Sequence, residues 1–302
     1  MEAVEALLKA GRIAASAREY GASLVKEGAS AREICEEVEA YIRRQGGEPA
    51  FPCNFSVDDV AAHYTPGVND DIRLRGGEVV KVDVGVHVDG YIADTATTVD
   101  LSGRWESLLE AVRGALEAVV KIMRPGISLY TIGKTIEQTI RKKGYKPIRN
   151  LTGHTIGRYL IHAGESIPNV ADRRLFYRRI QPGTLVAIEP FGTPGRGMVR
   201  EGSVVNIYSL HTLKPKRPLS DEERHLLEYI VGRYKTLPFT PRWLTTEWGE
   251  KAEDLVRALW RKGALHGYPI LVEVSGAVVA QFEHTFLVMS DRVIATTLVE
   301  GS

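Results

Sequence analysis

The sequence contains little cysteine, with only Cys35 and Cys53 in 302 residues. Two cysteines are too few for a disulfide framework, so we expect a protein of a reducing compartment. The chain also lacks any apolar run near the roughly 18 residues that a membrane span requires. Its amino end is amphipathic and rich in glutamate, unlike a secretory signal peptide. We therefore expect a cytoplasmic protein without a membrane partner.

A large net charge is also missing, because 39 lysines and arginines nearly cancel 38 aspartates and glutamates and leave a formal charge of +1. This balance excludes binding to nucleic acid through overall charge. Hydrophobic residues make up 44% of the chain and charged residues 25%, as in ordinary globular proteins. The length allows a large core without disulfides.

Several catalytic motifs do not occur in the chain. We find no GxSxG, no P-loop, no CxxC and no GxGxxG after a predicted strand. These absences leave no support for serine-nucleophile, phosphate-binding, thiol-redox or dinucleotide chemistry.

An internal repeat organises the chain. Helices are predicted near residues 4–26 and 31–45, and again near 105–123 and 128–144. Seven positions of the first helix pair match the second helix pair at a constant offset of 98 residues. They are two glycines, a serine that caps a helix, three apolar residues and an arginine: Gly28, Ser30, Ile34, Val38, Ile42, Arg43 and Gly46. A further match aligns residues 77–83 with 183–189 and places Asp83 on Glu189. The pattern predicts one pseudo-symmetric domain of two halves.

An insertion interrupts the second half. Helical patterns and prolines follow residue 193, and strand patterns return near residue 270. We therefore assign residues 1–193 and 266–302 to the main domain and residues 194–265 to an inserted helical subdomain. The halves of the main domain are then residues 1–100 and residues 101–193 with 266–302.

Two aspartates lie on the arms of a predicted hairpin. Residues 79–88 alternate between valine and other residues, and Asp89–Gly90 is a two-residue turn. This register places Asp94 opposite Gly85, with Asp83 on the same face as a diagonal neighbour about 7–8 Å away. Because glycine has no side chain, we expect Gly85 to leave space beneath the two carboxylates. Taken alone, two such aspartates are more often a solvated polar face. Here the acids gather on one face, which favours a shared cation.

Further candidate ligands occur later in the chain. Glu189 lies in the apolar strand predicted over residues 184–191, where an unpaired charge is costly. Glu283 lies in the strand predicted over residues 278–288 and shares its face with other polar side chains. His154 lies between glycines that let a ligand approach, and His162 follows it. His63 is the first-half counterpart of His162, one position out of register. A single histidine or edge-strand glutamate is more often structural.

Together, four carboxylates and one imidazole form an oxygen-rich ligand set. Such a set suits two divalent first-row ions better than a structural zinc site. Two ions about 3.5–4 Å apart activate a shared water and polarise a carbonyl, which indicates metal-assisted hydrolysis.

The motifs resemble those of one enzyme family over essentially the whole chain. They are AAHYTP at 61–66, KVDVG at 81–85, ADTA at 93–96, GH at 153–154, IEPF at 188–191 and QFEHT at 281–285. In this order they resemble the type II methionine aminopeptidases, which are metallohydrolases of the pita-bread fold. The chain is similar to the archaeal-type members, which lack a long amino-terminal extension. The resemblance implies an α+β fold with a pseudo-twofold repeat, an antiparallel sheet covered by helices and an inserted, winged-helix-like subdomain.

The resemblance also implies roles for single residues. Asp83 would bind one metal ion, Asp94 and Glu283 would bridge both, and His154 and Glu189 would complete the shell of the other. Glu189 would also act as general base. His63 and His162 would hydrogen-bond the scissile peptide and stabilise the tetrahedral intermediate. The methionine pocket would include Phe51, Ile161 and Tyr268, for which an ordinary place in the apolar core is an equal alternative.

The implied activity is removal of the amino-terminal methionine from nascent polypeptides, with two ions of Co, Mn, Fe or Zn as cofactors. We expect a cytoplasmic monomer that meets its substrates near the ribosome and requires no nucleic acid. Two alternatives stay open. One is an Xaa-Pro dipeptidase or aminopeptidase, which has the same ligands but usually carries a separate amino-terminal domain. The other is a metal-free binding protein on the same fold.

Overall fold

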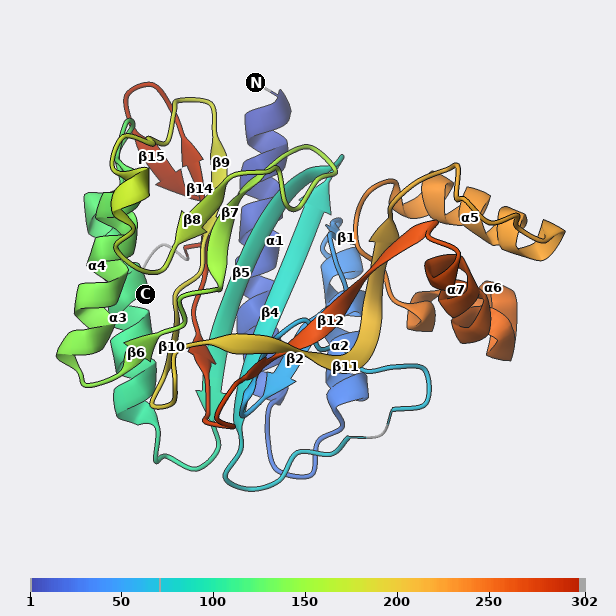
Figure 1. The fold of residues 1–302 in the computed structure, drawn as a ribbon, viewed down its shortest axis with the longest axis horizontal. Helices are drawn as coiled ribbons and strands as arrows, with labels where there is room; N and C mark the ends of the chain where they lie inside the picture. Colours follow the sequence, from blue (N-terminus) through green and yellow to red (C-terminus); the bar gives the residue numbers. More distant parts are fainter. Residues whose placement is uncertain (1, 71, 299–302) are drawn as a thin grey trace.

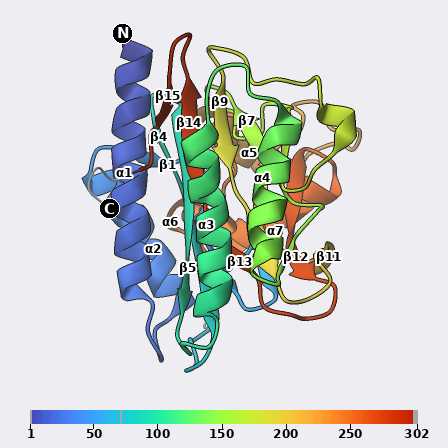
Figure 2. The same cartoon turned by 90° about the vertical axis from the view of Figure 1, so that its left-hand side faces the viewer.

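Antiparallel strands form the centre of the molecule, and four long helices cover one side of them (Figures 1 and 2). The computed structural model describes residues 2–70 and 72–298, so residue 1 and residues 299–302 at the ends of the predicted domain lie outside the described residues. No helix within the described residues has both the length and the apolarity needed to cross a membrane. The covering helices are α1 (Glu2–Leu24), α2 (Ala31–Arg44), α3 (Glu106–Ile122) and α4 (Leu129–Lys142).

The predicted hairpin forms the centre of the sheet in the first half. Its arms are β4 (Val79–Val88) and β5 (Tyr91–Asp100), and Gly85 lies opposite Asp94 as the turn arithmetic predicts. Asp89 and Gly90 both have positive φ, at 52° and 85°, which is the backbone of a type I′ turn. Two short strands, β1 (Glu48–Pro49) and β2 (Asn54–Val57), pair with β4 to complete this sheet.

The second half builds a larger sheet around the same centre. The strand order is β15-β14-β9-β7-β8, and its members are β7 (Thr152–Ile156), β8 (Ser166–Pro168), β9 (Leu185–Ile188), β14 (His284–Val288) and β15 (Val293–Ala295). The hydroxyl of Thr285 bonds the backbone of Asp94, so β14 and β5 join the two sheets. The metal-ligand candidates therefore lie where the halves meet.

The pseudo-twofold repeat is confirmed in the backbone. Ser30 and Ser128 cap α2 and α4, and each side chain accepts the amide of the residue three positions on. Ser30 forms an isolated bridge with Arg73, as Ser128 does with Arg179. The helices pack by the predicted apolar positions, which are all buried: Ile34, Val38 and Ile42 in α2, and Ile132, Ile136 and Ile140 in α4.

Two predicted strands are interrupted. The apolar segment 184–191 divides into β9 and β10 (Phe191–Thr193), and the segment 278–288 divides into β13 (Ala280–Gln281) and β14. β10 pairs with β13 in a small sheet with β6 (Lys146–Pro147), whereas β9 pairs with β14 in the larger one. Each of the two segments thus contributes one strand to the small sheet and one to the larger sheet. Glu189 and Glu283 lie at the two breaks between these strands. Pro190 lacks the amide that a continuous strand needs.

The segment assigned as the insertion, residues 194–265, begins with a long strand, and another strand follows it. These strands, β11 (Val199–Leu210) and β12 (Leu265–Glu273), form a long antiparallel pair, and β12 also pairs with β3 (Val60–Ala62). Between them lie α5 (Asp221–Tyr234), η2 (Pro241–Leu244), α6 (Thr245–Trp248), η3 (Gly249–Lys251) and α7 (Ala252–Arg261), to the right in Figure 1. Strand character therefore begins before the position near 270 that the pattern indicated. A further short helix, η1 (Arg173–Leu175), follows β8.

Candidate metal centre

One cavity is lined by all the predicted ligand residues. Asp83 and Asp94 come from β4 and β5, and His154 comes from β7. Glu189 and Glu283 reach the same cavity from the two strand breaks. Breaking the strands frees these residues from the regular in-and-out alternation of a sheet, so both carboxylates can turn toward the cavity.

The ligand atoms lie close enough to share cations. His154 Nε2 lies 3.5 Å from Asp94 Oδ2 and 3.6 Å from Glu189 Oε1. Ligand atoms of Asp94, His154 and Glu283 all lie within 4.8 Å of one another. The amide of Gln281 lies 3.4 Å from carboxylate oxygens of both Asp83 and Glu283 and links the remaining member to the cluster.

The imidazole of His154 is oriented by its second nitrogen. Nδ1 lies 3.4 Å from the backbone oxygen of Thr155, and a carbonyl can only accept, so Nδ1 carries the proton. Nε2 then presents a lone pair to the cavity, as a metal-bound histidine requires. Burial lowers the pKa of His154 to about 4, which keeps the ring neutral.

The four carboxylates strongly disfavour being charged together without a cation. Burial raises the pKa of Asp94 to about 7. Burial and neighbouring carboxylates raise the pKa values of Asp83, Glu189 and Glu283 well above their usual range. Asp83, Asp94 and Glu283 each have one buried carboxylate oxygen without a hydrogen-bond partner among the described residues. Unpartnered oxygens and a neutral imidazole facing one space fit a divalent cation.

Threonines hold the ligand strands in register. The hydroxyl of Thr285 accepts the amide of Asp94 and donates to its carbonyl, both at 2.8 Å. Thr95 Oγ1 donates to the carbonyl of Glu283 at 2.7 Å and itself accepts from Arg18 Nη1 at 2.6 Å. Sequence reasoning missed Thr95 and Arg18 because the partners are far apart in the chain.

The two other predicted histidines lie in the same cavity. The rings of His162 and His154 are 4.5 Å apart between centroids, and His63 is 5.7 Å from Tyr268. His63 Nδ1 lies 3.3 Å from the carbonyl of Pro269, so this nitrogen donates and Nε2 is an acceptor in the neutral ring. Burial and His162 lower the pKa of His63 to about 4. His63 also has a φ of 65°, an uncommon conformation for a non-glycine residue.

All three predicted pocket residues, Phe51, Ile161 and Tyr268, line this cavity, and so do Asn54 and Pro238, which sequence reasoning missed. The interpretation of Gly85 as space for the ligands is wrong. A Cβ at position 85 would lie 2.1 Å from Cε1 of Phe51, so Gly85 makes room for that ring. Asn54 lies opposite Asp83 in the pairing of β2 with β4. No local pattern indicated it, because its role depends on this pairing.

Comparison with known proteins gives consistent matches. The sequence profile of metallopeptidase family M24 matches residues 5–211. A methionine aminopeptidase from Saccharolobus solfataricus is 48% identical over 96% of both chains. One from Methanocaldococcus jannaschii is 45% identical over 98% of this chain and 99% of its own.

Solved structures share the fold at low sequence identity. A methionine aminopeptidase from Thermotoga maritima has a TM-score of 0.71 and 22% identity, covering 99% of this chain and 97% of its own. A prolidase from Pyrococcus furiosus has a TM-score of 0.62 and 17% identity, covering 99% of this chain and 64% of its own. A thermophilic Arx1 has a TM-score of 0.87 and 17% identity, covering 100% of this chain and 92% of its own. At these identities the likeness establishes the fold alone.

Proposed function

The chain belongs to metallopeptidase family M24, and from this premise we propose how its cavity removes the amino-terminal methionine of polypeptides in a metal-dependent hydrolysis. The observation that carries the proposal is the convergence of four carboxylates and one neutral imidazole on one cavity. Asp83, Asp94, His154, Glu189 and Glu283 would hold the divalent metal.

We propose two ions for each chain. The ligand set supports this number because carboxylates can bridge, and four of them supply more oxygens than one small ion needs. Metal analysis of the purified protein, reloaded with Mn²⁺, Fe²⁺, Co²⁺ or Zn²⁺ in turn, should find two ions per chain at saturation. Saturation at one ion per chain would contradict the proposal.

The protein groups around the metal have distinct tasks. Bound divalent metal lowers the pKa of a coordinated water and polarises the substrate carbonyl. Glu189 accepts the proton of the attacking water and passes it to the departing amine. The acceptor Nε2 of neutral His63 suits a peptide N–H of the substrate. His162, at the open side of the cavity, donates to the carbonyl oxygen as negative charge develops there.

The Glu189→Gln variant tests this assignment. Gln keeps the shape of the side chain but cannot accept a proton, so turnover of a Met-Ala-Ser peptide should be abolished. Metal content is measured in the same samples, because Glu189 is also assigned as a ligand. Near-normal turnover in this variant would rule out Glu189 as the base.

Substrate choice separates the proposal from the Xaa-Pro alternative. The Saccharolobus solfataricus protein, which is similar in sequence over nearly the whole chain, is a methionine aminopeptidase, whereas the prolidase shares only the fold. We expect hydrolysis of Met-Ala-Ser and none of Gly-Pro. The reverse preference would identify a proline-specific enzyme, and binding of neither metal nor substrate would identify a binding protein.

The cellular setting is also a proposal. We propose that the enzyme acts as a cytoplasmic monomer on nascent chains close to the ribosome. The support is that one chain supplies every residue around the cavity, and that Cys35 and Cys53 are free and buried. Light scattering should give the mass of one chain, and co-sedimentation with ribosomes should depend on nascent chains.

A further inference from the structure

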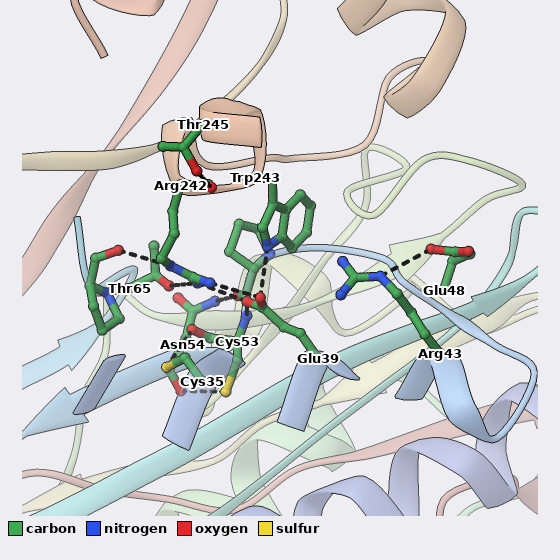
Figure 3. A network of polar contacts seen from close by, with 12 residues as sticks. Cys35, Glu39, Arg43, Glu48, Cys53, Asn54, Thr65, Arg242, Trp243 and Thr245 are labelled. Carbon is green, nitrogen blue, oxygen red and sulfur yellow. Dashed lines mark hydrogen bonds and ion pairs between the residues drawn. The ribbon is translucent and has the colours of Figure 1, made fainter. Parts of the chain in front are cut away.

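A buried ion pair joins the insertion to the first half of the main domain. Glu39 lies on α2 and Arg242 lies on η2, and two hydrogen bonds of 2.8 Å connect the carboxylate to the guanidinium (Figure 3). Their side chains are only 2% and 6% exposed. The contact is bidentate, which is the most directional form of an arginine–carboxylate pair.

Burying such a pair is an expensive way to attach two elements. Charges lose their hydration on burial, and an apolar pair of similar volume is often as stable or more so. The pair adds direction instead, because each bond requires a specific placement of both partners. Both side chains also hold backbone segments on either side of the contact.

Glu39 holds the backbone beside a cavity residue. Its Oε1 accepts the amide of Cys53 at 3.2 Å, and the next residue is Asn54. Asn54 lines the cavity and lies opposite Asp83 in the strand register. Its buried Oδ1 has no hydrogen-bond partner among the described residues.

Arg242 holds the segment that follows His63. Its Nε lies 3.4 Å from the carbonyl of Pro66, and its Nη2 lies 3.4 Å from the hydroxyl of Thr65, which is fully buried. His63 has the uncommon φ of 65°, so its backbone requires support from the surrounding structure. The guanidinium supplies that support two and three residues further along.

Further hydrogen bonds hold the residues around Arg242 in the insertion. The indole Nε1 of Trp243 donates to Glu39 Oε2 at 2.7 Å, and Thr245 Oγ1 donates to the carbonyl of Arg242 at 3.0 Å (Figure 3). Phe239 and Tyr208 exchange backbone hydrogen bonds of 2.7 and 2.8 Å, which fixes the chain next to Pro238. Pro238 lines the cavity.

We propose that Glu39 and Arg242 are positioning residues for substrate selectivity. Through one ion pair they hold the two separate segments that carry Asn54 and His63 around the first residue of the substrate. The proposal rests on the aminopeptidase function and adds residues that touch neither metal nor substrate. Its consequence is that loosening the pair affects substrate binding and selectivity more than the chemical step.

The test replaces both partners at once. The double variant Glu39→Met/Arg242→Met removes the charges together and leaves neither unpaired, so it should fold with bound metal. Its melting temperature should be lower than that of the wild type, because the amide of Cys53 and the indole of Trp243 lose their acceptor. We expect kcat/KM for Met-Ala-Ser to fall about tenfold, mainly through KM, because small displacements of binding groups are costly. Discrimination against Leu-Ala-Ser should fall as well.

Two further variants keep the test decisive. Arg242→Lys keeps the charge but cannot form the bidentate contact, and it should raise KM in the same direction. Glu253→Met/Arg257→Met removes an exposed pair of α7, whose atoms are 2.5 Å apart, and should leave KM and selectivity unchanged.

The outcomes separate the two claims. Unchanged KM and selectivity in a folded double variant, or in Arg242→Lys if the double variant does not fold, would overturn the positioning role. A drop in kcat alone would also overturn it. Inactivity of the wild-type enzyme on Met-Ala-Ser would instead refute the proposed function.

Discussion

The contact between Gly85 and Phe51 shows how one residue shapes the cavity. Gly85 lies on β4 opposite Asp94, and the Phe51 ring occupies the place where a side chain would stand. The same ring forms part of the cavity wall. The Phe51 ring can form this part of the cavity wall only because β4 has a glycine, and thus no side chain, at position 85.

Replacing this glycine by alanine should disturb both stability and substrate binding. A Cβ at position 85 would lie 2.1 Å from Phe51 Cε1, so the ring must move. For Gly85→Ala we expect unfolding to become easier by about 1–3 kcal/mol, as for other overpacked sites. KM for a methionine peptide should rise, as measured by steady-state kinetics beside urea unfolding.

A helical glycine provides the matched control. Gly114 lies within α3, where a Cβ would meet nothing closer than 4.0 Å. Gly114→Ala should raise stability by roughly 0.5–1 kcal/mol and leave KM unchanged. If Gly85→Ala behaved like this control, the ring would not be the reason for the glycine.

Single residues were predictable where their chemistry is exceptional. Acids gathered on one face of a valine-rich hairpin indicated a cation, and turn arithmetic gave the partner of Asp94. Nothing local distinguishes Asn54 or Pro238, whose places depend on pairing between distant strands. The proton position of His63 likewise depends on the carbonyl of Pro269, which only the fold brings near.

At the scale of elements, β5 and β14 are joined by hydroxyls where the two sheets meet. One threonine, Thr285, satisfies both the amide and the carbonyl of Asp94. The carbonyl of Glu283 is bonded by Thr95 in the same seam. The backbone at Asp94 and the backbone at Glu283 are thus held in place by threonine hydroxyls of the opposite strand.

Removing one hydroxyl should loosen the metal site. In Thr285→Val the shape is kept, but two buried backbone groups of Asp94 lose their partner. We expect a loss of stability of about 1–3 kcal/mol. Metal affinity, measured by titration calorimetry with Mn²⁺, should fall as well because Asp94 is less well held.

Thr193→Val is the matched control for this variant. Its hydroxyl also has two backbone partners, donating to the carbonyl of Val278 at 2.8 Å and accepting the amide of Gly195 at 3.0 Å, and Thr193 does not line the cavity. It should lower stability to a similar degree and leave Mn²⁺ affinity unchanged. Equal effects of both variants on affinity would mean that the seam has no special link to the ligands.

The elements themselves were mostly predictable, but their interruptions were not. Capping serines, amphipathic helices and the type I′ turn all have local causes. Glu189 and Glu283 appeared to lie in continuous strands because the first segment is apolar and the second alternates between polar and apolar residues. The breaks arise because two neighbouring strands leave one sheet and enter another together, which is a property of long-range pairing.

At the scale of the whole molecule, the carboxylate cluster makes stability depend on pH and metal. Folded-state pKa values of the four ligand carboxylates are raised, so without metal the folded protein binds more protons than the unfolded chain. Their contribution is fully present near pH 4 and is lost as pH rises through about 7, the value for Asp94, and beyond. The lowered pKa values of His63 and His154 act oppositely, but only below about 6.5.

The metal-free protein should therefore lose stability between pH 6.5 and 8.5. Charging the buried carboxylates is the cause, and bound cations remove it, so the melting temperature of Mn²⁺-loaded protein should fall less over this range. Calorimetry with EDTA-treated and reloaded samples makes the comparison. Burial lowers the pKa of Lys81 to about 7, so this group also titrates over the same range. It does so in the metal-free and in the metal-loaded protein, and its effect cancels when the two melting temperatures are compared.

Proton release gives an independent reading of the same linkage. Binding of Mn²⁺ at pH 7 should release protons from the carboxylates, so the apparent binding enthalpy should vary with the ionisation enthalpy of the buffer. Identical enthalpies in phosphate and Tris would contradict the raised pKa values.

The division of the ligands between the halves has a consequence for holding the molecule together. Asp83 and Asp94 belong to the first half, while His154, Glu189 and Glu283 belong to the second. Neither half has the complete set, so cations held by all five side chains would tie the halves to each other and oppose their separation.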